Sequence, residues 1–421
     1  MTQSFADMIY LFSCGALGLK PVLNHEIDFM AVHHHSMSQG VWHTVFLSIK
    51  RLYDNAQLSI DNDIFNNLRN QFMLSIMRNT QRTYLIHNLI KKLEDNKVRC
   101  CVLKGEIMSA LYKNPDCRIS SDTDILIEPR NKKRAIDILN EFGFDVKPLG
   151  ATSNHIVAAH PVAGIVELHL NLYNELYEDV WFNNIALIQE ECRVVKVDDD
   201  KEILTLGITD GLIFTALHCI KHFLSAGVGI RQIMDMLLYM KAFYNQINWE
   251  RFNKTMKHLK YENFIYNCIG IGIKYLNFDK EHLPSHTCNN TIMTAILDDI
   301  ELGGVFGKNE NERDGFSMQY TKARFNSFKK DEYHSYIKMW WHRKLITIIF
   351  PHPKTLALKF PYLRKSPLLY PIAWLHRIIR LIINLIKKDT SLNRYSNPAK
   401  QLIQSDIIDR RMELIRRLDM V

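Results

Sequence analysis

The sequence predicts an α+β protein in which a small α/β core is embedded between N-terminal and C-terminal helical regions. Three observations predict this class. Residues 1–95 carry apolar side chains at helical spacing. Residues 96–195 hold short β-rich runs separated by helices and turns. Helical spacing returns over 196–300, a region expected to complete the cleft, and continues in a basic, proline-punctuated region over 301–421.

The composition is that of a globular chain. It has 421 residues, of which 47% are hydrophobic and 23% charged, enough for a substantial core and two or three domains. The formal net charge of +8 suits a phosphate-bearing substrate, nucleic acid or an anionic membrane. A modest basic excess is equally common in proteins without such a partner.

Cysteine usage and the hydropathy pattern bear on the compartment. The eight cysteines are scattered without a Cys-x-x-Cys pair, which argues against a zinc site or a disulfide scaffold and favours a reducing compartment. The stretch Met1–Ser4 has no basic residue and the first apolar run is short, so we expect no signal peptide. Apolar runs are too short for a spanning helix. We therefore expect a cytoplasmic protein.

The first region is predicted to be a set of helices. A metal site at His33–His35 is disfavoured, because consecutive side chains on a helix point in different directions. The predicted helices are Ala6–Leu17, Asn24–His34, Trp42–Tyr53, Ile64–Arg78 and Thr83–Glu94.

The core begins with a strand–turn–helix unit. Val98–Leu103 is β-rich, Lys104-Gly105 ends it, and Glu106–Tyr112 has helical spacing. This order brings backbone amides and the Lys104 amine together, which suits phosphate binding. The alternative is an exposed lysine in a turn.

Two acids open the next predicted strand. Asp122-Thr123-Asp124 precedes an apolar run to Ile127, and side chains alternate along a strand, so both carboxylates share one face. Like charges this close repel unless they are neutralised. Mg²⁺ takes one or two carboxylates together with substrate phosphates, so we predict a site for Mg²⁺ or Mn²⁺ here.

A third acid lies on another alternating stretch, Gly164–Leu170. Glu167 and His169 share its polar face. A neighbouring strand would set Glu167 beside the Asp pair, and three such carboxylates can hold two metal ions for phosphoryl transfer. His169 could then hydrogen-bond the metal carboxylates or a nucleotide, with direct metal ligation as the less favoured alternative.

Three polar residues precede the Asp pair. The planar guanidinium of Arg118 suits a triphosphate, but a buried ion pair with Asp122 or Glu167 fits as well. Ser120 and Ser121 could bond phosphate oxygens or cap the turn.

The rest of the core is predicted as a helix at Asn131–Phe142, ended by Gly143, and then a mostly antiparallel set of strands. The further β-type stretches are Asp145–Leu149 and His155–His160. A second helical region is expected to begin within Asp198–Leu206.

Two strongly helical stretches follow, Leu206–Leu224 and Ile230–Phe243. His218 and His222 are four residues apart and share a helix face, as do Arg231 and Asp235 on the next helix. Metal chelation by the histidines, a polar cluster that contacts the nucleotide or acceptor, and a buried polar network all remain open.

The last part is basic and aromatic. Helices are expected to continue over 245–300, and the glycine-rich run Gly303–Gly307 is interpreted as structural. Pro371–Ile386 is predicted to be a helix with a narrow polar stripe, either a core helix or one lying in a membrane interface.

The order of these motifs resembles the polymerase-β-like nucleotidyltransferase superfamily, and within it the family of uncharacterised nucleotidyltransferases. The resemblance covers most of the chain. One departure is that the superfamily usually carries Gly-Ser shortly before its Asp pair, where this chain has Lys104-Gly105 and a longer spacer. The matching positions are Leu103-Lys104-Gly105, Arg118, Asp122, Asp124, Glu167-Leu168-His169, Asp210, His218, His222, Arg231 and Asp235.

The resemblance implies a metal-dependent transferase that moves an NMP from an NTP such as ATP to a hydroxyl or phosphate of an acceptor. Members of the family often lie among bacterial polysaccharide or modified-peptide biosynthesis genes. A non-catalytic scaffold or nucleotide-binding protein is the alternative, and a toxin-like transferase that modifies tRNA is another. Residues 366–388 could add a peripheral membrane contact.

Overall fold

The computed structural model describes residues 1–120, 122–147, 155–170, 192–198, 201–225, 227–304, 370–376 and 398–420. The described residues of 1–223, 227–309 and 418–420 form one compact unit, and those of 224–226 and 310–417 form another. The sheet and the candidate site belong to the first unit.

The first three helices pack closely together. They are α1 (Gln3–Leu17), α2 (Phe29–Ser38) and α3 (Trp42–Asp54). Gly15 lets α1 approach α3, since a Cβ there would lie 2.1 Å from the carbonyl oxygen of Thr44. Helix α2 begins later than predicted because Asp28 caps it and accepts a hydrogen bond from the amide of Ala31.

Helix α4 (Asn62–Asp95) is a single helix of 34 residues, so the prediction of two helices was wrong. The stretch that was left between them contains neither Gly nor Pro, so nothing in the backbone ends the helix there. Polar residues in it make contacts elsewhere: Asn79 Nδ2 donates to the carbonyl of Asp116, 3.1 Å away.

A mixed seven-stranded sheet forms the centre of the first unit, in the order β3-β4-β5-β2-β1-β7-β6. The β2–β5 and β1–β7 pairs are parallel and the other neighbours are antiparallel. The strands are β1 (Cys100–Val102), β2 (Asp122–Ile127), β3 (Asp145–Val146), β4 (His155–His160), β5 (Gly164–His169), β6 (Arg193–Asp198) and β7 (Lys201–Thr205).

Strand β7 corrects the prediction of helix within Asp198–Leu206. Glu202 is exposed and Ile203 buried, which is the alternation of a strand. Thr205 pairs with Val102 and donates its hydroxyl to that residue's carbonyl at 2.7 Å. The sheet therefore continues past residue 195, where the predicted core ends.

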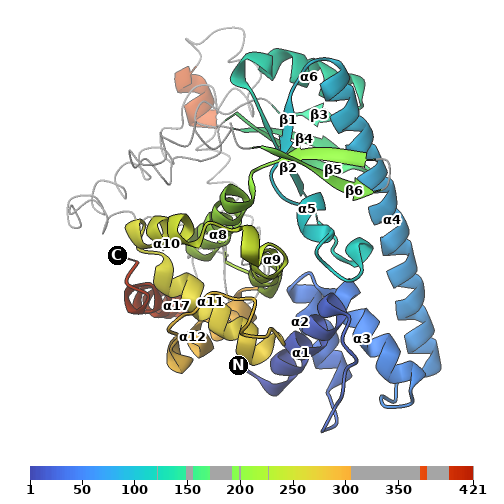
Figure 1. The fold of residues 1–421 in the computed structure, drawn as a ribbon, viewed down its shortest axis with the longest axis vertical. Helices are drawn as coiled ribbons and strands as arrows, with labels where there is room; N and C mark the ends of the chain where they lie inside the picture. The colour runs from blue at the N-terminus through green and yellow to red at the C-terminus, as the bar shows by residue number, and fades with distance from the viewer. Residues whose placement is uncertain are drawn as a thin grey trace. The chain divides into compact units, whose positions relative to one another are not determined.

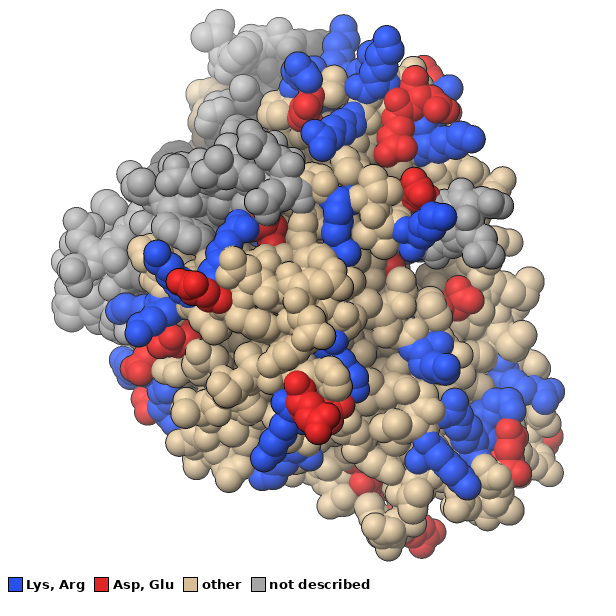
Figure 2. Space-filling model, in the orientation of Figure 1, with Lys and Arg blue, Asp and Glu red and all other residues tan. Residues whose placement is uncertain are grey.

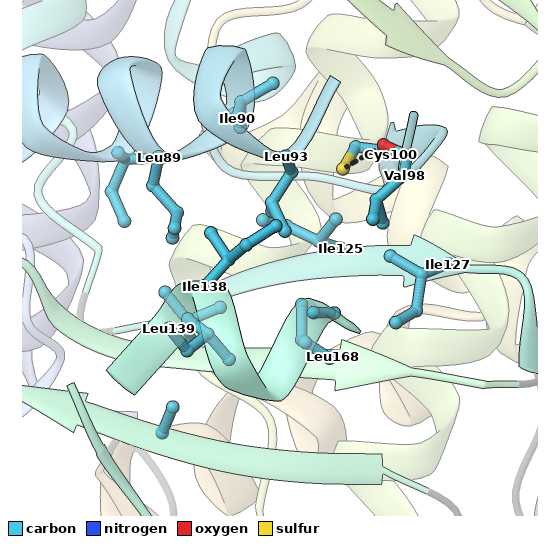
Figure 3. Close-up of a cluster of buried hydrophobic side chains, with 14 of the residues drawn as sticks. Leu89, Ile90, Leu93, Val98, Cys100, Ile125, Ile127, Ile138, Leu139 and Leu168 are labelled. Carbon is cyan, nitrogen blue, oxygen red and sulfur yellow. Dashed lines mark hydrogen bonds between the residues drawn. The ribbon is translucent and has the colours of Figure 1, made fainter. Parts of the chain in front are cut away.

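One face of the sheet carries the hydrophobic core of this region (Figure 3). Helices α4 and α6 (Lys132–Glu141) cover that face, as Figure 1 shows, and their apolar side chains meet those of the strands. The residues of this cluster include Leu89, Ile90, Leu93, Val98, Cys100, Ile125, Ile127, Ile138, Leu139 and Leu168. Because strand residues alternate, the intervening positions point to the opposite face.

The short helix α5 (Glu106–Ser109) follows β1, and α8 (Ile208–Ser225) and α9 (Ile230–Ala242) confirm the two predicted central helices. In Figure 1 these three lie on the side of the sheet away from α6. The expected helices over 245–300 are confirmed as α10 (Trp249–His258), α11 (Glu262–Tyr275) and α12 (Asn290–Gly303). A small mixed sheet flanked by helical segments is the fold class that the sequence predicts.

The second unit contains α17 (Pro398–Arg417) and a helical stretch over 370–376. That stretch agrees with the start of the predicted helix Pro371–Ile386, whose remainder lies outside the described residues together with 305–369. Within the described part of the chain, no helix is long and apolar enough to cross a membrane.

Charged side chains of both signs are interspersed on the face shown in Figure 2. Lys and Arg stand beside Asp and Glu, with apolar and neutral areas between them. On this face the Lys and Arg side chains of the described residues therefore do not form a single basic patch. The charge pattern on this face by itself does not select a partner.

Candidate active site

The register between β2 and β5 brings the acids together. Asp124 lies opposite Glu167 across this parallel pair, and Asp122 lies opposite Ile165. Side chains two residues apart share a face, so Asp122, Asp124 and Glu167 all point away from the core shown in Figure 3. Glu167 therefore lies beside the two aspartates although it is far from them in the sequence, as the alternation of its strand predicted.

Three side chains at this point can act as ligands to one metal ion. Asp124, Glu167 and His169 each offer a ligand atom, and these atoms lie within 4.8 Å of one another. His169 Nε2 lies 2.8 Å from Asp124 Oδ1 and 3.8 Å from Glu167 Oε2. Carboxylate oxygens suit Mg²⁺ and Mn²⁺, while an imidazole nitrogen suits softer divalent ions. This group can therefore hold a divalent ion, but it contains His169 in place of Asp122, which was one of the three predicted ligands.

Lys104 forms the counter-ion of these acids. Its Nζ lies 2.8 Å from Asp124 Oδ2 and 3.6 Å from Asp122 Oδ2. Burial disfavours the ammonium, but Asp124 and Asp122 outweigh burial and raise the pKa of Lys104. Burial likewise opposes the charged form of Asp124, yet the Lys104 ammonium and the His169 hydrogen bond hold the pKa of that carboxyl below its usual value. Lys104 is therefore not the exposed turn lysine of the alternative reading.

Gly105 makes the turn that presents Lys104. Its φ of +81° is in the region that favours glycine. A Cβ built at Gly105 would meet no heavy atom within 4 Å, so the backbone at this turn borders open space. A ligand can approach the chain closely here.

Arg118 is buried and ion-paired. Its Nε and Nη2 donate to the two carboxylate oxygens of Asp235 at 2.9 and 2.6 Å, and the Tyr112 hydroxyl donates to the same carboxylate at 2.8 Å. Burial opposes the charge, and Asp235 raises the pKa of the Arg118 guanidinium above its usual value. The buried-pair alternative describes this position, with Asp235 as the partner in place of Asp122 or Glu167.

Helix α9 also holds the loop before β2. Arg231 Nη1 donates to the carbonyl of Ile119 at 2.5 Å, and burial lowers the pKa of Arg231. The Ser120 hydroxyl lies 3.1 Å from the Asp122 carbonyl and 3.2 Å from its Oδ1, so it caps the start of the strand. Ser121 lies outside the described residues. A phosphate contact by these residues stays a prediction.

The histidine pair of α8 joins the same cluster. His218 Nε2 lies 2.8 Å from Lys104 Nζ and 2.9 Å from His222 Nε2. Burial, followed by the Lys104 charge, lowers the pKa of both imidazoles, and that of His222 to about 3. Neutral His218 can therefore accept a hydrogen bond from the Lys104 ammonium. Asp210, also in the resemblance, pairs instead with Arg251.

Sequence reasoning missed Arg82, whose guanidinium contacts the start of β2. A signal was present: Arg82 precedes Ile86 by four residues and Leu89 by seven, so a buried cation stands on the apolar stripe of α4. Tyr112, the second donor to Asp235, was also missed, because its role depends on a residue far away in the sequence.

The acidic strands of a mixed sheet, with a lysine and histidines beside them, agree with a protein of the nucleotidyltransferase class. The family model described as uncharacterised nucleotidyltransferase matches residues 25–276. The chain belongs to this family of transferases, as the sequence resemblance predicted.

The chain is similar to a crystal structure of an antigenic nucleotidyltransferase-like protein from Paracoccidioides brasiliensis, at 13% identity and a TM-score of 0.29. The match covers 42% of this chain and 88% of the other. A search of curated proteins gave no significant match.

Proposed function

We propose that this protein is a metal-dependent nucleotidyltransferase that moves an NMP from an NTP to a hydroxyl or phosphate of an acceptor. The observation that carries the proposal is the meeting of Asp122, Asp124 and Glu167 on one face of the sheet, with the Lys104 ammonium against the aspartates. Family membership agrees with it.

Asp122, Asp124 and Glu167 would hold the metal, Mg²⁺ or Mn²⁺, which neutralises triphosphate charge when bound. Lys104 would leave the aspartates and contact phosphate oxygens, with neutral His218 as its remaining partner. Glu167 would accept the proton of the acceptor hydroxyl. The acceptor oxygen bonds to the α-phosphorus, the bond from that phosphorus to the β-phosphate oxygen breaks, and pyrophosphate leaves.

The remaining polar residues would position the reacting groups without contacting the substrate. Arg118, Arg231 and Ser120 fix the loop that leads into β2. Positioning of the reacting groups accounts for much of the rate of such transfers, because the protein itself makes no covalent bond.

ATP is the first nucleotide to test, and the acceptor is a sugar, a peptide, a protein or, less favoured, a tRNA. A setting in bacterial polysaccharide or modified-peptide biosynthesis rests on the sequence resemblance alone. Cytoplasmic location and a peripheral membrane contact through the C-terminal region belong to the same proposal.

The test uses all four α-labelled NTPs with Mg²⁺ or Mn²⁺, and measures label on the protein itself and in a lysate. The wild type should transfer label, and the Asp122→Asn/Asp124→Asn double variant should not, with the fold checked by circular dichroism. Equal transfer by both proteins would contradict the proposal. Metal-dependent nucleotide stabilisation without any transfer would favour the nucleotide-binding alternative, and label on tRNA would favour the toxin-like one.

A further inference from the structure

Arg82 of helix α4 contacts two parts of the candidate site, the start of β2 and the start of α5. Its side chain is 10% exposed. Nη2 donates to the carbonyl oxygen of Asp122 at 3.0 Å and to the Thr123 hydroxyl at 2.5 Å. Nη1 lies 4.0 Å from Glu106 Oε1, on the residue that follows the Lys104-Gly105 turn. One guanidinium therefore contacts the first two residues of β2 and the first residue of α5.

The Asp122 carbonyl lies where a strand neighbour is missing. The amide of Leu103 donates to the carbonyl of Asp124, so that carbonyl points toward β1. Carbonyls two residues apart in a strand point the same way, and the Asp122 carbonyl therefore also points to the β1 side. Strand β1 ends at Val102 and the chain turns away at Gly105. Arg82, with the Ser120 hydroxyl, supplies the donors that β1 no longer provides.

The contact with Thr123 depends on the register of β2. Thr123 points toward α4, on the face opposite to Asp122 and Asp124. A shift of one residue would exchange the two faces and turn both acids toward the core. Arg82 and the Thr123 hydroxyl can meet only in the register that places the acids in the site.

We propose that Arg82 is a positioning residue of the acidic site. It holds the start of β2 in the register that turns Asp122 and Asp124 toward Glu167, and through Glu106 it ties this strand to the turn that carries Lys104. The inference rests on the proposed function in that the positioned acids are taken to bind a metal ion. An arginine suits this role because its planar fork can donate in several directions at once, which a lysine ammonium does not reproduce.

The experiment measures Mn²⁺ binding to the full chain by electron paramagnetic resonance. Arg82→Met should weaken binding about tenfold or more, which is typical of residues that orient metal ligands from behind. Thr123→Val should weaken Mn²⁺ binding less. The double variant should bind no more weakly than Arg82→Met, because Thr123→Val removes only a contact that Arg82→Met has already removed. Arg78→Met, an exposed arginine one turn earlier on the same helix, is the matched control and should bind as the wild type does.

Hydrogen exchange supplies a readout that needs no metal. Amides of residues 122–127 should exchange faster in Thr123→Val than in the wild type or in Thr123→Ser, which keeps the hydroxyl. Thr123→Val preserves the side-chain size, so the contact is tested even if Arg82→Met does not fold. Wild-type Mn²⁺ affinity and wild-type exchange in Thr123→Val would overturn the inference. A wild type that binds no Mn²⁺ would refute the proposed function instead, and exchange in β2 would then decide this inference alone.

Discussion

Lys104 Nζ lies 2.8 Å from Asp124 Oδ2, so the ammonium expected to contact phosphate is paired with a carboxylate expected to bind metal. A lysine cannot remain at this distance while a divalent cation takes the same oxygen, because the two positive charges repel. If Asp124 binds a metal ion as proposed, that ion would displace Lys104, and the displaced ammonium would be available to contact phosphate. Metal binding and phosphate binding would then be linked through this one side chain.

Lys104→Met should raise the affinity for Mn²⁺ in the absence of nucleotide. The competing ammonium is lost while the Asp124 side chain stays in place, so we expect about a tenfold fall in Kd, equal to about 1.4 kcal/mol. The same variant should bind Mn²⁺–ATP more weakly than the wild type. Isothermal titration calorimetry measures both constants.

Lys50→Met is the control for that experiment, because it removes the same charge from an exposed ion pair with Asp54 and should change neither constant. Weaker Mn²⁺ binding by Lys104→Met would show that the lysine assembles the carboxylates rather than competing for them.

Asp235→Asn should destabilise the protein by about 3–5 kcal/mol, because it leaves the buried guanidinium of Arg118 without a counter-charge. Urea unfolding followed by circular dichroism measures the loss. Asp279→Asn breaks an ion pair with Lys241 in which both side chains are substantially exposed, and should cost about 1 kcal/mol or less. Equal losses in the two variants would contradict the structural role of the Arg118–Asp235 pair.

Much of the site could be predicted from local patterns. The alternation around Glu167 and the Asp122-x-Asp124 spacing are properties of single strands, and these fixed which side chains share a face. The partner of Arg118 could not be predicted, since Asp235 lies 117 residues further along the chain and the pair forms only when α9 packs against the loop. Strand β7 was missed for a related reason: it is a short strand that is stabilised by its pairing with β1 and β6.

The stability of the fold should fall as the pH is lowered from about 6.5. Burial lowers the pKa of His222 to about 3 and that of His43 to about 4, so each is neutral in the folded state where the unfolded chain would bind a proton. Between the folded and unfolded pKa values, stability rises with pH by about 1.4 kcal/mol per pH unit for each histidine. Above the unfolded pKa the contribution is complete.

His43→Gln isolates one of these terms in the free energy of unfolding. The free energy of unfolding of this variant is measured by urea unfolding from pH 4.5 to 7.5. Plotted against pH, it should rise less steeply than that of the wild type below pH 6.5 and run parallel to it above. Parallel profiles for His43→Gln and the wild type over the whole range would mean that folding does not lower the pKa of His43.

Glu167→Gln should separate proton removal from folding. The amide keeps the shape of the side chain, which is partly exposed at the edge of the site, so the unfolding midpoint should change little. If Glu167 takes the acceptor proton, kcat for NMP transfer should fall about 10²–10⁴-fold, with a smaller change in the KM for the nucleotide. Glu202→Gln, an exposed glutamate on β7 of the same sheet, should transfer at the wild-type rate. An unchanged kcat in Glu167→Gln would assign the proton to another base, and an unchanged Mn²⁺ affinity in addition would remove Glu167 from the metal site altogether.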